Sequence, residues 1–238
     1  MLVSHRDEFH ERPTAPADWW EDHPDVLGGR DLAEGGTWLG VDRHGRLATL
    51  TNFREPGAAA GGLSRGRLVA DYLRGDAGPA AFARAALEKG ERFAGFNLLL
   101  ADPAEAAYAG NRAGEARTLA PGVYGLSNHH LDTPWPKVRA GRERFRARLE
   151  APSLEAADLL DVLEDRTVPP DHELPDTGVG PEKERLLGAS FIVSPDYGTR
   201  AATAVIVHRE GAMTFVERTF SPAGEPTGER RFDFRIRR

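Results

Sequence analysis

Three polar stretches of this chain contain residues that can carry out chemistry. They are HRDE at residues 5–8, LTNFR at residues 50–54 and GLSNHHLDTPWPK at residues 125–137. Asn52 and Asn128 each lie where a strand is expected to end. An asparagine amide at such a place either stabilises a backbone corner through an Asx turn or donates a hydrogen bond to a developing oxyanion. Both interpretations stay open at this point.

Adjacent histidines in the third stretch raise the question of a metal site. His129 and His130 are expected on a strand, where successive side chains point to opposite faces, so the two rings should not chelate one ion together. The chain has no HExxH spacing and no cysteine. The sequence therefore predicts no metal site. A haem needs only an apolar cleft and one axial side chain, and it is not excluded. Four tryptophans could line such a cleft or serve as core anchors, namely Trp19, Trp20, Trp38 and Trp135.

The elements that must position these residues alternate in blocks along the chain. Residues 37–52 are predicted to form a β-hairpin, and four helices are predicted at residues 64–75, 78–89, 137–150 and 153–164. Further strands are predicted at residues 93–102, 105–111, 115–120, 122–128, 189–194, 200–209, 212–221 and 229–237. Short connections favour antiparallel pairing. The pattern predicts an α+β fold with antiparallel sheets, in a single domain over residues 1–238.

The length and net charge of the chain argue against several classes of protein. A chain of 238 residues is long enough to bury a core without disulfides. The net charge of −6 gives no support to nucleic-acid binding. No apolar stretch approaches the ~20 residues of a membrane helix, and charged residues follow Met1 too closely for a signal peptide. We therefore expect a cytoplasmic protein with no membrane span. The frequent Ala, Arg, Gly and Pro residues give the impression of a GC-rich bacterial gene.

Several ordered motifs resemble those of one known family. They are HRDEFHERPTAPADWW at residues 5–20, GRDLAEGGTWLGVDRHGRLATLTNFREP at 29–56, SRGRLVADYL at 64–73, FAGFNLLLAD at 93–102 and YGLSNHHLDTPWPKV at 124–138. In this order they resemble the NRDE family, also called the transport and Golgi organisation protein 2 family. That family is named for an Asn-Arg-Asp-Glu tetrad, and His5 stands here in place of the asparagine. The resemblance is strong over the first three fifths of the chain and loose in the C-terminal strands.

The family is similar to the N-terminal-nucleophile hydrolases, so the resemblance implies a four-layer αββα sandwich. Family members usually begin Met-Cys and run through a first apolar strand before the tetrad. Removal of the Met leaves a Cys whose own α-amine can act as the base. Relative to that pattern, this chain lacks the Cys and most or all of the first strand. Either the start codon is mis-assigned and the Cys lies upstream, or the nucleophile has been lost.

The resemblance also implies roles for individual residues. Arg6 would orient a substrate carbonyl or carboxylate, and Asp7 would hydrogen-bond the terminal amine. Asn52 and Asn128 would contact the oxyanion or the substrate amide. Alternatively, Arg6, Asp7 and Glu8 form only an ion-pair network that braces the strand end. Substrate-binding positions are expected at Glu8, Trp38, Arg54, His129 and Trp135.

Two functions from different classes follow from the resemblance. The first is a protein that binds or mobilises haem or an acyl or lipid small molecule and has no nucleophile of its own. The second is an N-terminal-nucleophile-type amidohydrolase or acyltransferase whose Cys lies upstream of a mis-assigned start. No resident cofactor is expected, and haem enters only as a transported ligand. The expected partner is a small molecule, and neither a nucleic-acid partner nor a membrane span is expected.

Overall fold

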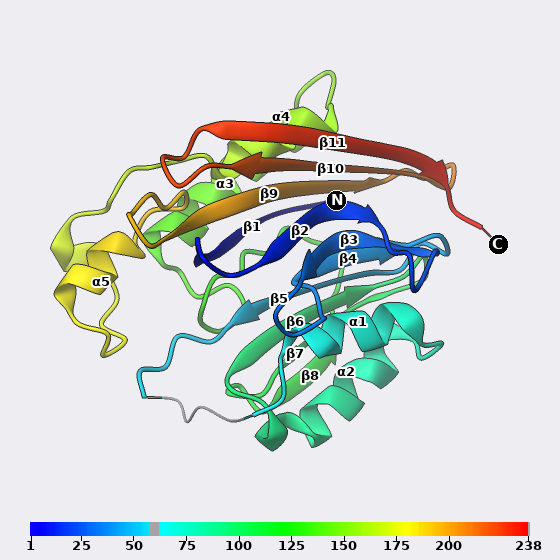
Figure 1. The fold of residues 1–238 in the computed structure, drawn as a ribbon, viewed down its shortest axis with the longest axis horizontal. Helices are drawn as coiled ribbons and strands as arrows, with labels where there is room; N and C mark the ends of the chain where they lie inside the picture. Colours follow the sequence, from blue (N-terminus) through cyan, green and yellow to red (C-terminus); the bar gives the residue numbers. More distant parts are fainter. Residues whose placement is uncertain (58–61, 238) are drawn as a thin grey trace. The chain divides into compact units, whose positions relative to one another are not determined.

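The computed structural model describes residues 1–57 and 62–237, and its backbone contacts divide the chain into two compact units (Figure 1). The terminal unit consists of residues 1–12 and 134–235, and the central unit consists of residues 13–133 and 236–238. Each unit contains one antiparallel sheet together with helices, so the predicted α+β class with antiparallel sheets is confirmed. The four-layer sandwich and the single domain stay predictions.

The terminal unit is built on a four-stranded sheet of order β1-β9-β10-β11, so a strand from the start of the chain pairs with one from near its end. Helix α4 packs on β1, β9 and β10, and its Leu159 and Leu160 are fully buried beside Phe191. The elements of this unit are β1 (Leu2–Phe9), α3 (Pro136–Leu149), α4 (Ala156–Leu160), η2 (Asp161–Leu163), η3 (Asp171–Glu173), α5 (Pro181–Leu186), β9 (Tyr197–Val207), β10 (Ala212–Phe220) and β11 (Pro226–Arg235).

The central unit is built on a seven-stranded antiparallel sheet whose strands pair in chain order, from β2 to β8. Helix α1 packs on β3, β4 and β5, and helix α2 packs on β6, β7 and β8. The core between helices and sheet contains Tyr72, Phe96 and Leu98, each with no exposed surface. The elements are β2 (Thr14–Trp19), β3 (Val26–Asp31), β4 (Leu39–Asp42), β5 (Leu47–Asn52), α1 (Gly66–Arg74), α2 (Pro79–Glu88), η1 (Gly90–Arg92), β6 (Phe96–Ala101), β7 (Ala106–Gly110) and β8 (Glu115–Thr118).

The predicted hairpin over residues 37–52 is present as β4 and β5. Its turn is held by Asp42, whose Oδ1 accepts hydrogen bonds of 2.8 and 2.9 Å from the backbone N–H groups of His44 and Arg46. Gly45 has a φ of +88°, a conformation that glycine adopts without steric cost. The sequence DRHG therefore specifies this turn through local hydrogen bonds and one glycine.

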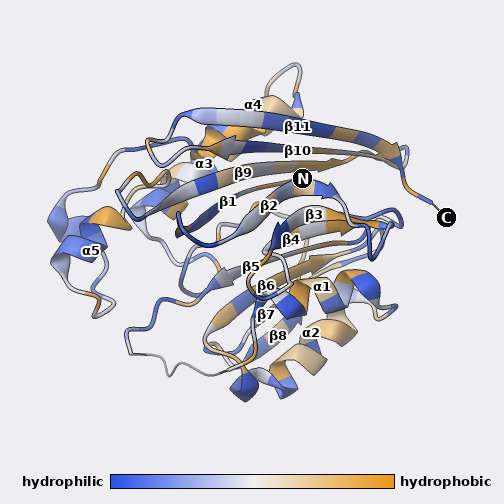
Figure 2. Ribbon diagram, viewed as in Figure 1, coloured by the Kyte–Doolittle hydropathy of each residue, from blue (hydrophilic) through white to orange (hydrophobic). Residues whose placement is uncertain are grey.

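The C-terminal strand also follows its sequence pattern. Along β11, Phe232 and Phe234 are half-buried while Arg231, Asp233 and Arg235 are exposed. Figure 2 shows the same alternation of hydrophobic and hydrophilic residues along this strand. This pattern is that of a strand with one face toward a core.

Two predicted strands, at residues 122–128 and 189–194, are wrong. Neither segment joins a sheet, because its backbone groups bond to side chains and isolated carbonyls. The N–H of Ile192, for example, donates to the Thr199 hydroxyl at 2.9 Å. The Ser127 carbonyl accepts a hydrogen bond of 2.7 Å from the Thr51 hydroxyl.

In the described part of the chain, no helix has the length and hydrophobicity needed to cross a membrane.

The core of the terminal unit makes a first prediction. Replacing Leu159 by Ala should lower the free energy of unfolding by about 2–5 kcal/mol, because the fully buried side chain would leave a cavity. Leu149, in the same unit, is 40% exposed, and Leu149→Ala should change it by about 0.5 kcal/mol or less. Urea unfolding of both variants measures the difference, and equal effects would contradict this assignment of the core.

Candidate functional site

The nine residues predicted to form the site are divided between the two units. The terminal unit contains Arg6, Asp7, Glu8 and Trp135. The central unit contains Trp38, Asn52, Arg54, Asn128 and His129.

Residues 6–8 lie in the second half of β1, at a β-bulge. Leu2–Phe9 pair with β9 as a strand, and the tetrad is part of this strand. The register shifts between Arg6 and Asp7, and a bulge of this kind re-aims the side chains beside it. Asp7 Oδ1 accepts a hydrogen bond of 2.7 Å from the Thr199 hydroxyl, whose oxygen accepts from the Ile192 N–H. Asp7 is therefore oriented by β9.

Arg6 and Glu8 belong to a short line of charges along this strand. Arg6 is buried, with 7% of its surface exposed, and its Nη2 lies 4.0 Å from Glu8 Oε2. Glu8 also accepts a hydrogen bond of 2.9 Å from the Phe9 N–H, and its Oε2 lies 3.7 Å from Arg12 Nε. These contacts are those expected if the tetrad braces the strand end.

The two tryptophans predicted to bind substrate have positions set by neighbouring elements. Trp135 is the N-cap residue of α3, directly before Pro136, and its carbonyl accepts from the N–H groups of Val138 and Arg139. The Trp38 ring lies against Gly29 of β3, so closely that a Cβ at Gly29 would meet the ring at 2.2 Å.

Asn52 and Asn128 are joined by a hydrogen bond that involves the backbone of Asn52. The Asn128 amide donates a hydrogen bond of 3.0 Å to the Asn52 carbonyl. In return, the N–H of Arg54 donates to the Asn128 carbonyl at 2.7 Å. These contacts join residues 125–133, which we call the 125–133 loop, to the end of β5.

A buried polar network below the same loop involves residues that the sequence analysis did not assign to the site. Asn97 of β6 and Tyr108 of β7 are 1% and 0% exposed, and the Tyr108 hydroxyl donates a 2.6 Å hydrogen bond to Asn97 Oδ1. Asn97 Nδ2 donates to the His129 carbonyl at 2.8 Å and to the Thr51 hydroxyl at 3.2 Å. The signal for Asn97 was an amide inside the apolar stretch GFNLL. A buried amide is tolerated when its hydrogen bonds are satisfied.

The 125–133 loop is closed on itself by Asp132. Its Oδ1 accepts a 2.8 Å hydrogen bond from the Gly125 N–H, and its own N–H donates to the Gly125 carbonyl at 2.8 Å. Asp132 has a φ of +61°, which is uncommon for a residue other than glycine and is tolerated best by Asn and Asp. Such a conformation persists only where surrounding contacts determine it.

The expectation that His129 and His130 point to opposite faces of a strand is wrong. The loop is not a strand, and the two rings lie edge to face with centroids 4.4 Å apart. The Phe53 ring lies 4.9 Å from the His129 ring and 5.1 Å from the His130 ring. His129 Nδ1 is 2.9 Å from the Thr133 hydroxyl. Burial lowers the pKa of His129, and the nearby His130 and Arg54 add to this effect, so its imidazole is neutral near pH 7.

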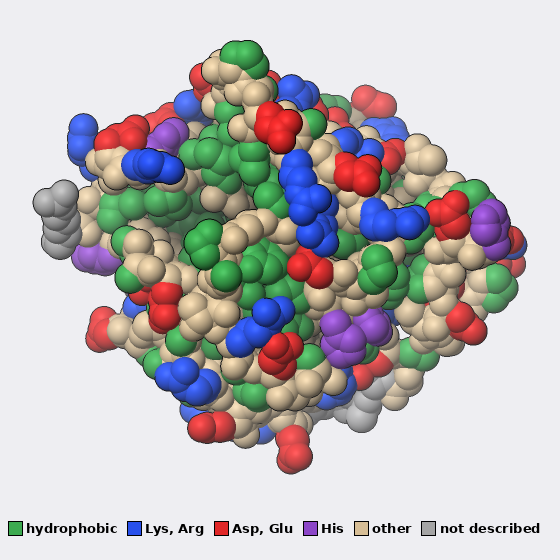
Figure 3. Space-filling view, turned by 180° about the vertical axis from the view of Figure 1, so that it is seen from behind, with side chains coloured by type: hydrophobic (Ala, Val, Ile, Leu, Met, Phe, Trp, Pro, Cys, Tyr) green, Lys and Arg blue, Asp and Glu red, His purple; other side chains and the backbone are tan. Residues whose placement is uncertain are grey.

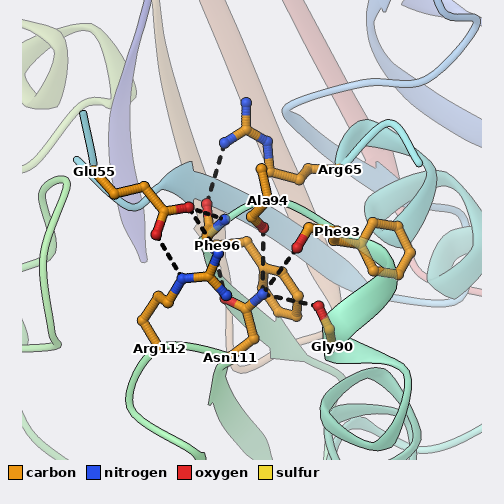
Figure 4. Close-up of polar contacts among 9 residues, drawn as sticks. Glu55, Arg65, Gly90, Phe93, Ala94, Phe96, Asn111 and Arg112 are labelled. Carbon is orange, nitrogen blue, oxygen red and sulfur yellow. Dashed lines mark hydrogen bonds and ion pairs between the residues drawn. The ribbon is translucent and has the colours of Figure 1, made fainter. Parts of the chain in front are cut away.

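The segment that carries Phe53 and Arg54 is held by an ion pair on its other side (Figure 4). Arg112 donates to both oxygens of Glu55, at 2.6 and 2.8 Å, and Glu55 Oε1 also accepts from the Gly95 N–H at 2.8 Å. The Gly95 carbonyl accepts from Arg65 at 3.1 Å and from the Phe53 N–H at 2.8 Å. A Cβ at Gly95 would lie 2.7 Å from that of Phe53, so only glycine allows this close approach.

Asn111, next to Arg112, completes this arrangement. Its Oδ1 accepts from the Phe96 N–H at 2.8 Å, and its Nδ2 donates to the Gly90 carbonyl at 3.0 Å (Figure 4). The turn before β8 is thereby fixed to the start of β6.

A family model described as Transport and Golgi organisation 2 matches residues 1–222. The chain belongs to this family. It is 38% identical over 240 residues to "Transport and Golgi organization protein 2 homolog" of Bos taurus, with 92% of this chain and 86% of that protein covered.

Two other relatives in the Transport and Golgi organisation 2 family show comparable coverage. The Homo sapiens "Transport and Golgi organization protein 2 homolog" is 36% identical over 92% of this chain and 86% of its own length. The Drosophila melanogaster "Transport and Golgi organization protein 2" is 31% identical over 96% of this chain and 88% of its own length. These relatives are animal proteins, and they lend no support to the impression of a bacterial gene.

The two asparagines that hold the 125–133 loop should differ in their contribution to stability. Asn97→Ala should lower the free energy of unfolding by about 1–3 kcal/mol, because it removes the buried hydrogen bonds that Asn97 makes with the Tyr108 hydroxyl and the His129 carbonyl. Asn128→Ala removes one hydrogen bond near the surface and should cost about 1 kcal/mol or less. Urea unfolding of the two variants tests this order, and the reverse order would contradict the role assigned to Asn97.

The Glu55–Arg112 pair predicts a pH-dependent stability. The hydrogen bonds from Arg112 and then Gly95 lower the pKa of Glu55 below its ordinary value of 4.5. The ionised carboxylate therefore stabilises the folded state above that pH, and the stabilisation is lost as the pH falls through the lowered pKa. Glu55→Gln should cost about 1 kcal/mol at pH 7 and little near pH 3.

The matched control for this experiment is Glu115→Gln. Glu115 pairs with Arg117 at 2.6 Å, but its side chain is 44% exposed, and such surface pairs contribute little. Unfolding of both variants at several pH values gives the comparison. A pH-independent loss in Glu55→Gln would show that packing, not ionisation, explains its effect.

Proposed function

We propose that this chain binds and hands on a small molecule that combines an apolar body with an acidic group, of the haem or acyl class, and leaves it chemically unchanged. The observation that carries this proposal is the group of Phe53, His129 and His130 rings beside Arg54, in the central unit. The relatives are named for transport, which agrees with a carrier. The cytoplasmic location stays a prediction from the sequence.

Each side chain of this group has a chemical part in the proposed binding. Phe53 offers an aromatic face to an apolar body. The Arg54 guanidinium is suited to a carboxylate or an acyl phosphate, because its planar fork of donors matches their oxygens. The neutral imidazole of His129 is able to ligate the iron of a haem.

The backbone around these side chains supports a binding role because it is held before any ligand arrives. Glu55 and Gly95 fix residues 53–55, and Asn97 fixes the 125–133 loop from below. The direct link between the two segments is the hydrogen bond from the Arg54 N–H to the Asn128 carbonyl. A site that is already ordered loses less conformational entropy on binding.

The enzyme hypothesis is favoured by a different observation, in the terminal unit. Arg6 is buried at the bulge of β1, and Asp7 is oriented by the Thr199 hydroxyl. A nucleophile at the start of a chain needs only its own α-amine as base, and Asp7 would tune the pKa of that amine. Residues 1–238 contain no Cys to serve as this nucleophile. Mass spectrometry of the N-terminal peptide of the native protein tests the hypothesis, since it requires an upstream Cys.

Haem titration tests the carrier proposal. Added haem should give a shifted Soret band that saturates at one equivalent, and a long-chain fatty acyl compound should compete for it. Arg54→Gln should weaken binding about tenfold, the loss expected for one charge-assisted contact of about 1.4 kcal/mol. Arg117→Gln, an arginine of the same unit with a 47% exposed side chain, should bind as the unaltered chain does. A spectrum of aggregated haem that does not saturate would contradict haem binding. If the long-chain acyl compound also failed to bind, the whole proposal would be overturned.

A further inference from the structure

The histidine pair of the 125–133 loop places two imidazole rings at one position on the surface. Their centroids are 4.4 Å apart, with an interplanar angle of 71°, and both residues are half-buried. Histidine side chains reach the surface on the face drawn in Figure 3, among acidic and basic ones. Two imidazoles this close are able to share one cation, which two side chains on opposite faces of a strand are not.

One nitrogen of each ring bears on metal binding. When His129 Nδ1–H donates to the Thr133 hydroxyl, 2.9 Å away, Nε2 carries a lone pair for a cation. A metal-ligating histidine usually makes a second contact of this kind through its other nitrogen. His130 Nδ1 is buried and has no hydrogen-bond partner among the described residues. A buried polar atom without a partner calls for an explanation, and a bound ion is one.

The loop backbone keeps the two rings in place. Asn97 Nδ2 holds the His129 carbonyl at 2.8 Å, and the Thr133 N–H donates to the His130 carbonyl at 3.1 Å. Phe53 lies about equally far from both rings, at 4.9 and 5.1 Å, and limits their rotation. Ligands held by packing and hydrogen bonds bind a cation without a large ordering cost.

We propose that His129 and His130 together bind one divalent transition-metal ion, Cu²⁺ in the first place, with water in the remaining coordination positions. No group of three or more His, Cys, Asp or Glu residues with metal-binding geometry occurs in the described ranges, so the site has two protein nitrogens. Zn²⁺ sites usually have three or four protein ligands, whereas Cu²⁺ stands highest in affinity for nitrogen donors. Arg54 lies close enough to His129 to affect its charge, and it opposes a cation there. Because of this opposing charge, the ion needs a ring nitrogen from each of the two histidines.

The experiment titrates Cu²⁺ alone into the full chain, without haem or an acyl compound, so its result does not depend on the proposed carrier function. One equivalent should bind, and electron paramagnetic resonance should show coordination by two imidazole nitrogens. His129→Phe and His130→Phe keep a ring in the aromatic group, and each should weaken binding by at least about tenfold. Thr133→Val should weaken it by about tenfold through the lost contact at Nδ1.

The control is His172→Ala, a histidine of the terminal unit whose side chain is 81% exposed, and it should bind Cu²⁺ as the unaltered chain does. Melting temperatures within a few degrees of the unaltered chain establish that the Phe variants are folded. If either Phe variant unfolds, the electron paramagnetic resonance spectrum of the unaltered chain decides the question. A spectrum without two coordinated imidazole nitrogens would then overturn the proposal. The proposal would be overturned if no saturable binding occurred at one equivalent, or if either folded Phe variant bound Cu²⁺ as tightly as the unaltered chain.

Discussion

The buried hydrogen bond between the Tyr108 hydroxyl and Asn97 Oδ1 is the contact on which the candidate site depends. It fixes which way the Asn97 amide points, so that its Nδ2 faces the Thr51 hydroxyl and the His129 carbonyl. The 125–133 loop joins no sheet, and its backbone groups bond to side chains and to single backbone groups instead of a neighbouring strand. Gly110 gives room for this arrangement, because a Cβ there would lie 2.5 Å from the Tyr108 hydroxyl.

The loop and the segment after β5 lie side by side because both are fixed to β5, β6 and β7 or to residues next to these strands. Asn97 and Tyr108 hold the loop from β6 and β7, and Thr51 and Asn128 hold it at β5. On the other side, Glu55 and Arg112 hold the segment that carries Phe53. Aromatic and imidazole rings thereby meet at positions set by buried polar contacts. Side chains that must hold a fixed geometry to bind a ligand are best positioned by such contacts.

In the terminal unit, too, hydrogen bonds fix the direction of polar side chains. The bulge in β1 re-aims the side chains around Arg6 and Asp7, and Thr199 of β9 holds Asp7 in place. Because Thr199 also accepts from the Ile192 N–H, it ties a segment outside the sheet to the same point. A buried arginine beside an oriented carboxylate fits either a braced strand or a remnant of catalytic machinery. Its contacts with Glu8 agree with the first.

The sequence by itself determined the α+β class, the hairpin at residues 37–52, most of the strands and the family, because hydrophobic periodicity, local turns and ordered motifs are written along the chain. It also singled out Asn52 and Asn128 as candidate site residues. Only the tertiary structure decided that residues 125–133 are a loop, that His129 and His130 lie side by side, and that Asn97 and Tyr108 hold them. Those contacts join residues far apart in the chain, and a local pattern carries no information about which distant partner satisfies a buried polar group.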